Sequence, residues 1–503
     1  MKFKTTLLLG ALILPVIIFA QHITYSVPEK DDYRTVDFEV IGKVGGNFVV
    51  YKNFHNKNAV SVYDNGMELK ERVDLDFIPD RTINVDFVPY PDYFFVIYQY
   101  QKRSILYCMG AKLDGEGKKI GDPIQLDTTH LNVFADNKIY STTFSEDKQH
   151  IMIYKIQKKN EKFNFTTLLF NPQLELQNKS RWVVPYDEHR DVYGDFFVDN
   201  DGNFVFTKSE KAGNRELISK VFLITKAPLS DTFAINQLKT TDSYLDEIKL
   251  KVDNINNKYL INSFYYSQKR GNVDGLFTAV WDKQTQQQTV ENAIRFDDTL
   301  KQQAKMEGTT KVAFNDFFIK HVILKKDGGF ILTGEDYYTQ SRGNPWNRMD
   351  YLYGYPYFSS YNYYMYSPSS YWYRPRGFYN SSQQRYYYNN IVVMDIDKDG
   401  KLLWSNVVHK SQFDDETDNF LSYQIMNAGG ELHFLFNELE RRNQLIADQS
   451  ILPDGTLKRN PTLKSLDKGY QFMPRLAKQV SAKQIIVPCT LRNYICFAKI
   501  DYS

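Results

Sequence analysis

The fold is decided by two stretches, Lys325-Lys326-Asp327-Gly328-Gly329-Phe330-Ile331-Leu332-Thr333-Gly334-Glu335 and Ile391-Val392-Val393-Met394-Asp395-Ile396-Asp397-Lys398-Asp399-Gly400-Lys401-Leu402-Leu403-Trp404. In each stretch, apolar and polar residues alternate around a tight Gly-Gly or Asp-Gly turn. Alternation with a period of two predicts strands, and glycine supplies the positive φ angles that tight hairpin turns need. The two stretches therefore predict two β-hairpins, which together make one four-stranded meander.

Related hairpin pairs recur along the chain, with a period of about 45–60 residues that is typical of propeller blades. We place the blade starts near residues 36, 82, 131, 192, 245, 317, 420 and 474. The predicted fold is therefore all-β, a single β-propeller of eight four-stranded blades, because one meander cannot bury both of its faces alone. Seven blades is the nearest alternative, since the segment 131–171 is weakly patterned.

The last predicted blade has only three strands, at about 474–480, 483–490 and 494–500. The short apolar segment Ile23–Val27 precedes the first full blade and is well placed to supply the fourth strand. This pairing would close the propeller and remove an exposed sheet edge, which otherwise invites aggregation.

The repeat resembles a known group of proteins. Gly328–Gly334 and Asp397–Trp404 are similar to the propeller repeats of many exported bacterial proteins, and are closest in style to those of Bacteroidota. That resemblance implies a shared architecture and no single activity.

Residues 1–20 are predicted to be a signal peptide, with Lys2 and Lys4 before an apolar run from Leu7 to Phe19 and a cleavage residue at Ala20. The run is shorter than the roughly 20 apolar residues of a spanning helix. We expect no transmembrane segment, and no lipid anchor because no cysteine follows the run. Residues 21–503 would form the exported propeller, located in the periplasm, at the outer membrane or outside the cell.

Composition excludes several classes of protein. The chain has 62 basic and 60 acidic residues, so a nucleic-acid partner is not expected. No Gly-x-Ser-x-Gly elbow or phosphate loop is present, and none of the eight histidines forms a His-x-His or His-Glu-x-x-His pair. Only Trp404, four residues after Gly400, approaches the pattern of quinone dehydrogenases. We therefore expect no cofactor.

Asp395, Asp397 and Asp399 have the spacing of a calcium loop, which needs oxygen ligands from alternate residues. The twelfth position is Asn406 where a bidentate acid is needed. An ordinary polar hairpin turn is the preferred interpretation, and the calcium site remains a weak candidate.

The cysteines are Cys108, Cys489 and Cys496. If Arg492-Asn493 is a two-residue hairpin turn, Cys489 and Cys496 face each other across it. A cross-strand disulfide and two unpaired buried thiols are both compatible with this register.

An insertion at 339–390 interrupts one predicted blade between its second and third strands, and it is rich in tyrosine and arginine. Tyr, Trp and Arg dominate interface hot spots, and long ordered loops commonly carry function. The alternative is a lid that only covers the propeller. The binding residues that we select are Trp346, Tyr364, Trp372, Tyr373, Arg374, Arg376 and Tyr387.

The leading functional hypothesis is a non-enzymatic, exported scaffold that engages an envelope or outer-membrane protein through this insertion. One alternative is a glycan-binding protein that uses the same aromatic residues. A second alternative is a hydrolase or lyase with a polar axial pocket, for which acids and histidines gathered at the pocket would argue. No pattern selects two carboxylates as a catalytic pair, so no catalytic residue is predicted and enzymatic activity is not the favoured reading.

Overall fold

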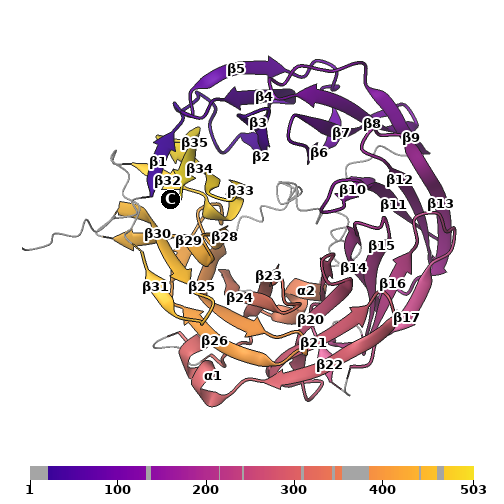
Figure 1. Cartoon of the computed structure of the whole chain (residues 1–503), viewed down its shortest axis with the longest axis vertical. Coiled ribbons are helices and arrows are strands. Elements are labelled where there is room, and N and C mark those ends of the chain that lie inside the picture. The colour runs from indigo at the N-terminus through magenta and orange to yellow at the C-terminus, as the bar shows by residue number, and fades with distance from the viewer. Residues whose placement is uncertain are drawn as a thin grey trace, which may run out of the picture.

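Figure 1 shows antiparallel sheets arranged in a ring around a central axis. The computed structural model describes residues 21–131, 138–213, 216–240, 243–306, 311–341, 346–353, 384–440, 443–460 and 469–502. Helical segments in these ranges are short, namely α1 (Asp298–Ala304), α2 (Arg348–Tyr353) and the 3-10 turn η3 (Pro474–Leu476). Within the same ranges, no helix has the length and apolar character needed to cross a membrane. The prediction of an all-β, propeller-like fold is confirmed.

Four sheets are simple meanders of four strands each. Their strands are β2 (Val36–Val44), β3 (Asn47–Phe54), β4 (Lys57–Tyr63) and β5 (Leu69–Asp74); β6 (Thr82–Pro89), β7 (Tyr93–Lys102), β8 (Ile105–Asp114) and β9 (Ile124–His130); β10 (Tyr140–Phe144), β11 (Ile151–Lys159), β12 (Lys162–Phe170) and β13 (Leu176–Pro185); β28 (Tyr423–Ala428), β29 (Glu431–Glu440), β30 (Asn443–Ile451) and β31 (Leu457–Arg459). The weakly patterned segment 131–171 thus contributes three strands of a regular sheet, which begins at Tyr140.

One sheet has nine strands. They are β14 (Asp191–Val198), β15 (Phe204–Lys211), β16 (Ile218–Lys226), β17 (Ala234–Gln237), β18 (Tyr244–Leu245), β19 (Lys249–Asp253), β20 (Lys258–Tyr266), β21 (Gly275–Asp282) and β22 (Gln287–Arg295). It consists of two meanders that are joined by β18, because Leu245 pairs with Ile218 of β16 on one side and with Tyr265 of β20 on the other.

Two sheets have five strands each. They are β23 (Phe317–Leu324), β24 (Phe330–Ser341), β25 (Gln384–Ile396), β26 (Leu402–Val408) and β27 (Gln412–Asp414); and β1 (His22–Tyr25), β32 (Tyr470–Phe472), β33 (Lys478–Ser481), β34 (Gln484–Leu491) and β35 (Tyr494–Asp501). The predicted pairing of the N-terminal strand is confirmed, since Ile23 lies opposite Ile500. The first and last strands that the structure describes therefore share one sheet.

Apolar side chains fill the space between neighbouring sheets. Val36, Phe38 and Val40 of β2, for example, pack against Ile486 of β34 and Phe497 of β35. Burial of apolar surface stabilises the fold by roughly 25 cal/mol per Å². Each sheet is therefore held by its neighbours on both faces, as the alternation in the sequence requires.

Buried polar side chains near the ends of second strands tie one sheet to the next. Oε1 of Gln99 in β7 accepts a hydrogen bond from the backbone N–H of Tyr140 at 2.8 Å. Asn437 in β29 donates its amide to the carbonyl oxygen of Phe472 at 2.7 Å. These side chains satisfy backbone groups that would otherwise be buried without partners.

The insertion is shorter than predicted at both ends. The strands β24 and β25 continue their ladder as far as the pair Ser341–Gln384. Rings of Tyr338 and Tyr387 stack across the two strands at 4.5 Å, which stabilises this extension. Residues 339–341 and 384–390 therefore belong to the sheet.

The helix α2 follows this extension and is anchored to the neighbouring meander. Nη2 and Nε of Arg348 donate to Oδ2 of Asp246 at 2.7 and 3.0 Å. The guanidinium group also lies 4.0 Å from the centroid of the Phe318 ring. Both charges are buried and paired with each other, so Arg348 fixes α2 on the propeller-like body.

Candidate functional site

The innermost strands place charged side chains around the axis of the ring. Figure 1 shows β2, β6, β10, β14, β23, β28 and β33 nearest to its centre. The pairing register shifts within five of these strands, at Val40/Gly42, Thr82/Asn84, Gly194/Phe197, Ile319/His321 and Gln479/Ser481. Such bulges turn side chains out of the regular alternation, and they are common beside functional sites.

Glu39 lies on β2, one residue before the bulged segment. Its neighbours Phe38 and Val40 pack toward β34 and β35, so alternation places Glu39 on the opposite face of the strand. Burial raises the pKa of Glu39 to about 8, an effect that nearby Lys478 only partly offsets. The carboxyl group is therefore mainly protonated at neutral pH.

Three further charged residues lie around Glu39, and together the four form the axial quartet: Glu39, Asp86, Lys138 and Lys478. Lys478 of β33 donates from Nζ to the carbonyl oxygen of Ile41 at 3.0 Å. Burial lowers the pKa of Lys478, and Glu39 opposes that shift. Asp86 of β6 forms an ion pair with Lys138 at 2.9 Å. The quartet thus comes from sheets that are neighbours around the axis.

Other inner strands carry titratable groups as well. Burial lowers the pKa of His321 on β23 to about 4, with Lys320 and Lys251 adding to the effect. Its imidazole contacts the ring of Tyr423 edge-on, at 5.5 Å between centroids. Burial also raises the pKa of Asp195 on β14 to about 6. The inner strands therefore carry a neutral imidazole and carboxyl groups that titrate near neutral pH.

This arrangement is suited to proton transfer. Pairs of titratable groups whose surroundings move their pKa values apart are a common feature of acid–base sites. In the axial quartet, burial favours the neutral forms of Glu39 and Lys478, while Asp86 and Lys138 pair with each other. Glu39 is thereby a candidate proton donor, and Lys478 is a candidate partner for an anionic substrate group.

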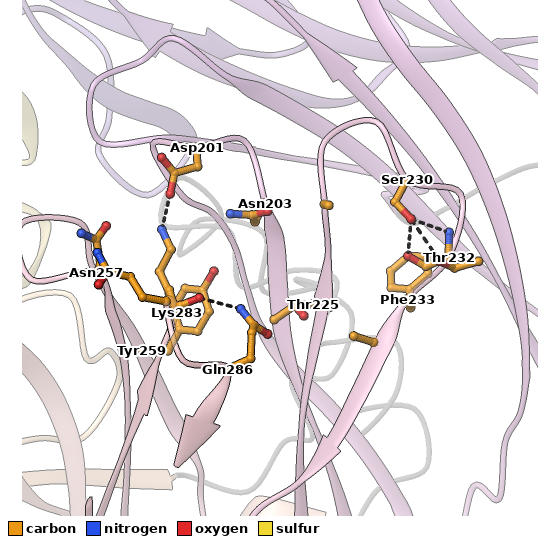
Figure 2. Close-up of a pocket in the computed structure, with 13 residues that line it drawn as sticks. Asp201, Asn203, Thr225, Ser230, Thr232, Phe233, Asn257, Tyr259, Lys283 and Gln286 are labelled. Carbon is orange, nitrogen blue, oxygen red and sulfur yellow. Dashed lines mark hydrogen bonds and ion pairs between the residues drawn. The ribbon is translucent and has the colours of Figure 1, made fainter. Parts of the chain in front are cut away.

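A second feature lies at the rim of the nine-stranded sheet and is shown in Figure 2. This rim pocket has a volume of 650 Å³. Its lining residues are Asp201, Asn203, Thr225, Ala227, Ser230, Thr232, Phe233, Ala234, Asn257, Tyr259, Lys283, Gln284 and Gln286. They come from hairpin turns and strand ends of the two meanders that β18 joins.

Five of the seven predicted binding residues lie outside the described residues. They are Tyr364, Trp372, Tyr373, Arg374 and Arg376. The other two do not come together. Trp346 donates from Nε1 to Oδ1 of Asp316 at 2.8 Å and packs on Tyr337, whereas Tyr387 stacks on Tyr338 on the other face of the strand pair. Both of these residues fasten the insertion to its sheet.

Two of the three aspartates of the calcium candidate accept hydrogen bonds within their own sheet and turn. Oδ1 of Asp395 accepts a hydrogen bond from Nζ of Lys325 at 2.7 Å. Oδ1 of Asp397 accepts from the backbone N–H groups of Asp399 and Lys401 at 2.9 and 2.8 Å. Among the residues with described positions, no group of three or more His, Cys, Asp or Glu gathers as a metal site.

The predicted register of the cysteines is confirmed, because Cys489 lies directly opposite Cys496. Arg492 and Asn493 form the turn with φ angles of 52° and 69°. The two sulfur atoms are 2.9 Å apart, and both cysteines are buried free thiols in this structure.

The axial quartet and the rim pocket were both missed from the sequence. Asp37 and Glu39 alternate with apolar residues on β2, which is the ordinary pattern of a strand with one solvated face. The rim residues Asn257 and Gln286 occupy turns, where polar residues are common. Only the ring shows which polar positions share the axis or the same edge.

No protein-family model matches the chain, and no curated protein matches it in sequence. Solved structures do match. A prolyl endopeptidase is 9% identical with a TM-score of 0.41, over 92% of this chain and 55% of that chain. Prolyl oligopeptidase B from Galerina marginata is 9% identical with a TM-score of 0.40, over 90% of this chain and 55% of that one. The polysaccharide lyase Uly1 is 11% identical with a TM-score of 0.38, over 83% of this chain and 89% of that chain.

These matches correct one prediction. The sequence favoured a non-enzymatic scaffold that binds an envelope protein. The three matching structures are instead those of enzymes, namely two peptidases and a lyase. The scaffold hypothesis is not proposed again. The chain spans about half the length of the two peptidase chains, and at these identities and scores the likeness concerns the fold alone and selects no activity.

Proposed function

We propose that the protein is a hydrolase or a lyase that uses the axial quartet for proton transfer, with Glu39 as the proton donor. The half-buried position of Glu39 beside Lys478 and Asp86 carries this proposal, because it raises the pKa of the carboxyl group to about 8 and leaves it mainly protonated near neutral pH. Such a group can protonate the oxygen or nitrogen that leaves when a bond is cleaved. General acid catalysis of this kind typically contributes about 10²–10⁴-fold to the rate.

The two reaction classes use the other charges differently. A hydrolase adds water across the cleaved bond, so a second group must accept a proton from that water. A lyase instead removes a proton from a carbon atom next to a substrate carboxylate, and a nearby cation stabilises the charge that develops. Lys478 donates to a backbone carbonyl rather than to a carboxylate, and a substrate carboxylate beside it would favour its charged form. An anionic polymer is therefore the substrate class that fits a lyase here.

The experiment is a comparison of purified wild type and Glu39→Gln on neutral polysaccharides, uronate-containing polysaccharides and peptides. Appearance of an unsaturated sugar end would identify a lyase, and a new reducing end or amine without unsaturation would identify a hydrolase. Glu39→Gln should lower kcat/KM at least 100-fold, in line with the loss of a general acid. Glu71→Gln on the outer strand β5 is the matched control and should retain full activity. Full activity of Glu39→Gln would show that the proton donor is another residue.

We further propose that the ring is a closed propeller of eight blades. This count takes the nine-stranded sheet as two blades, and the sheet of β1 and β32–β35 as the blade in which the chain ends meet. The pairing of β1 with β35 supports it. Deletion of residues 21–28 should then give an aggregating product, and an unchanged melting temperature would contradict closure.

We also propose that the protein is exported and that residues 1–20 direct its export. The basic residues Lys2 and Lys4, followed by an apolar run, support this proposal. N-terminal sequencing of the protein from its native cell envelope or culture medium should find a chain that begins at or near Gln21.

A further inference from the structure

We propose that the rim pocket is a binding site for a neutral carbohydrate. This site is separate from the axial quartet and does not depend on the activity proposed there. Its volume of 650 Å³ lies within the range of small-molecule sites, about 300–1,000 Å³. Some polar groups of the lining are already engaged with the protein, and others remain available to a ligand.

The charges of the lining are engaged with each other. Lys283 is the cation of the lining, and its Nζ lies 2.6 Å from Asp199 and 2.6 Å from Asp201. Asp199 is fully buried and also accepts a hydrogen bond from Tyr259 at 2.7 Å. An anionic ligand would have to break these contacts, because the pocket offers it no other cation. A neutral ligand leaves them intact.

Several neutral polar side chains remain available. Within the described residues, the side chains of Thr225, Asn257 and Gln284 make no hydrogen bond to the protein, although all three line the pocket. Figure 2 shows Asn257 on one side of the pocket, the pair Ser230 and Thr232 on the other, and Thr225 between them. An amide supplies both a donor and an acceptor, which matches neighbouring sugar hydroxyl groups.

An aromatic ring completes the lining. Phe233 is only partly buried, and its ring stacks on that of Trp182 at 4.5 Å. It lies on the side of Ser230 and Thr232 in Figure 2, across the pocket from Asn257 and Lys283. Sugars combine apolar C–H faces with a rim of hydroxyl groups, so an aromatic ring opposite amides suits them better than it suits a purely polar solute.

The backbone fixes the amide side of the pocket. Asn257 and Gln286 both lie in hairpin turns with left-handed backbone, at φ angles of 53° and 54°. The N–H of Lys283 donates to the carbonyl oxygen of Asn257 at 3.0 Å, and the side chain of Gln286 donates to the carbonyl oxygen of Lys283 at 2.7 Å. The two turns therefore hold each other, so the site is largely formed before a ligand arrives.

The test is calorimetric titration of the purified protein with cellohexaose, xylohexaose, mannohexaose and maltohexaose, and with a galacturonic acid oligomer for contrast. At least one neutral oligosaccharide should bind. Ala227→Trp should abolish that binding, because Ala227 is exposed and a larger side chain there fills the pocket without disturbing the core. Asn257→Ala and Gln284→Ala should each weaken it about tenfold, the equivalent of about 1.4 kcal/mol for one hydrogen bond.

Gln287→Ala is the matched control, since Gln287 is exposed on the same hairpin and does not line the pocket. It should bind as the wild type does. Glu39→Gln should also bind normally, which separates this site from the axial activity. Failure of every neutral oligosaccharide to bind, binding that persists in Ala227→Trp, or tighter binding of the acidic oligomer would each overturn the proposal.

Discussion

The rim pocket and the axial quartet both place a lysine beside carboxylates, yet the pKa of the lysine is shifted in opposite directions at the two places. At the rim, burial alone would lower the pKa of Lys283, but hydrogen bonds with Asp199 and Asp201 outweigh it and the pKa is raised. At the axis, burial lowers the pKa of Lys478 and raises that of Glu39, and their mutual attraction does not reverse either shift.

Contact geometry accounts for the difference. Lys283 touches both of its carboxylates at 2.6 Å, and charge-assisted hydrogen bonds of this kind are the strong ones. The Nζ of Lys478 instead donates to a backbone carbonyl, that of Ile41. A buried ionisable group stays charged when it directly contacts a group of opposite charge, and without such a contact its neutral form is favoured. We therefore assign binding to the rim and proton transfer to the axis.

The largest effect on stability is expected from removal of Lys283, the lysine that is paired with carboxylates at the rim. Lys283→Met should destabilise the protein by about 3–5 kcal/mol, because it leaves the carboxylate of Asp199 buried without a cation. Urea unfolding at neutral pH measures the loss. The double variant Lys283→Met/Asp199→Asn should recover much of it, since the uncompensated charge is gone. A single variant as stable as the wild type would mean that the pair at the rim is not held as described.

Much of the fold was predictable from the sequence because a hairpin turn is specified by a few residues that are adjacent in the chain. The Arg492-Asn493 turn was enough to predict that Cys489 and Cys496 face each other. The limits of the insertion were not predictable in the same way. Tyr337 and Tyr388 face each other in a ladder that continues to Ser341, but polar and aromatic residues mix there without the apolar alternation that marks a strand.

The candidate site was much less predictable. The residues of the axial quartet are 40 or more positions apart in sequence, and no motif joins them. Glu39 looks like any polar residue on the solvated face of an amphipathic strand, and only the closeness of β33 and β6 leaves it half-buried. The site is formed by contacts between sheets, which the sequence does not show. The strands are formed by contacts within hairpins, which local sequence patterns do show.

Glu39 should make the free energy of unfolding fall as pH rises. Unfolded chain carries Glu39 with its ordinary pKa of 4.5, while the folded protein holds it at about 8. Between these values the folded state keeps a proton that the unfolded state has released. The stability due to Glu39 is thus complete below pH 4.5 and is lost as pH rises through 8. We expect a loss of roughly 2 kcal/mol between about pH 6 and pH 9.

Urea unfolding of wild type and Glu39→Gln at both pH values measures this effect. The difference between the two proteins isolates Glu39 from Lys478, whose lowered pKa acts in the opposite direction. Parallel curves for the two proteins would show that Glu39 is ionised in the folded state, and the contrast between axis and rim would then fail.

His321 should give a smaller effect of the opposite sign. Its folded pKa of about 4 lies below the ordinary value of 6.5, so the folded protein disfavours the charged imidazole. The stability associated with the neutral ring is complete above pH 6.5 and is lost as pH falls toward 4. His321→Gln should remove on the order of 1–2 kcal/mol of that acid sensitivity. Chemical-shift titration of the imidazole in the folded protein is the direct check, and a pKa near 6.5 would show that the surroundings of His321 do not disfavour its charged form.

Removal of the unpaired lysine should have the smallest effect. Lys478→Met loses one hydrogen bond to the carbonyl of Ile41, which is worth about 1 kcal/mol, and it replaces an ammonium group whose charged form burial disfavours with an apolar chain of similar length. Its unfolding free energy should therefore stay within about 1 kcal/mol of the wild type, against the several kcal/mol expected for Lys283→Met. The same change should raise the pKa of Glu39 further, because Lys478 is the cation that holds it down. A loss of unfolding free energy as large as that of Lys283→Met would mean that Lys478 is charged and paired with a carboxylate in the folded protein. The proposed difference between the two lysines would then be wrong.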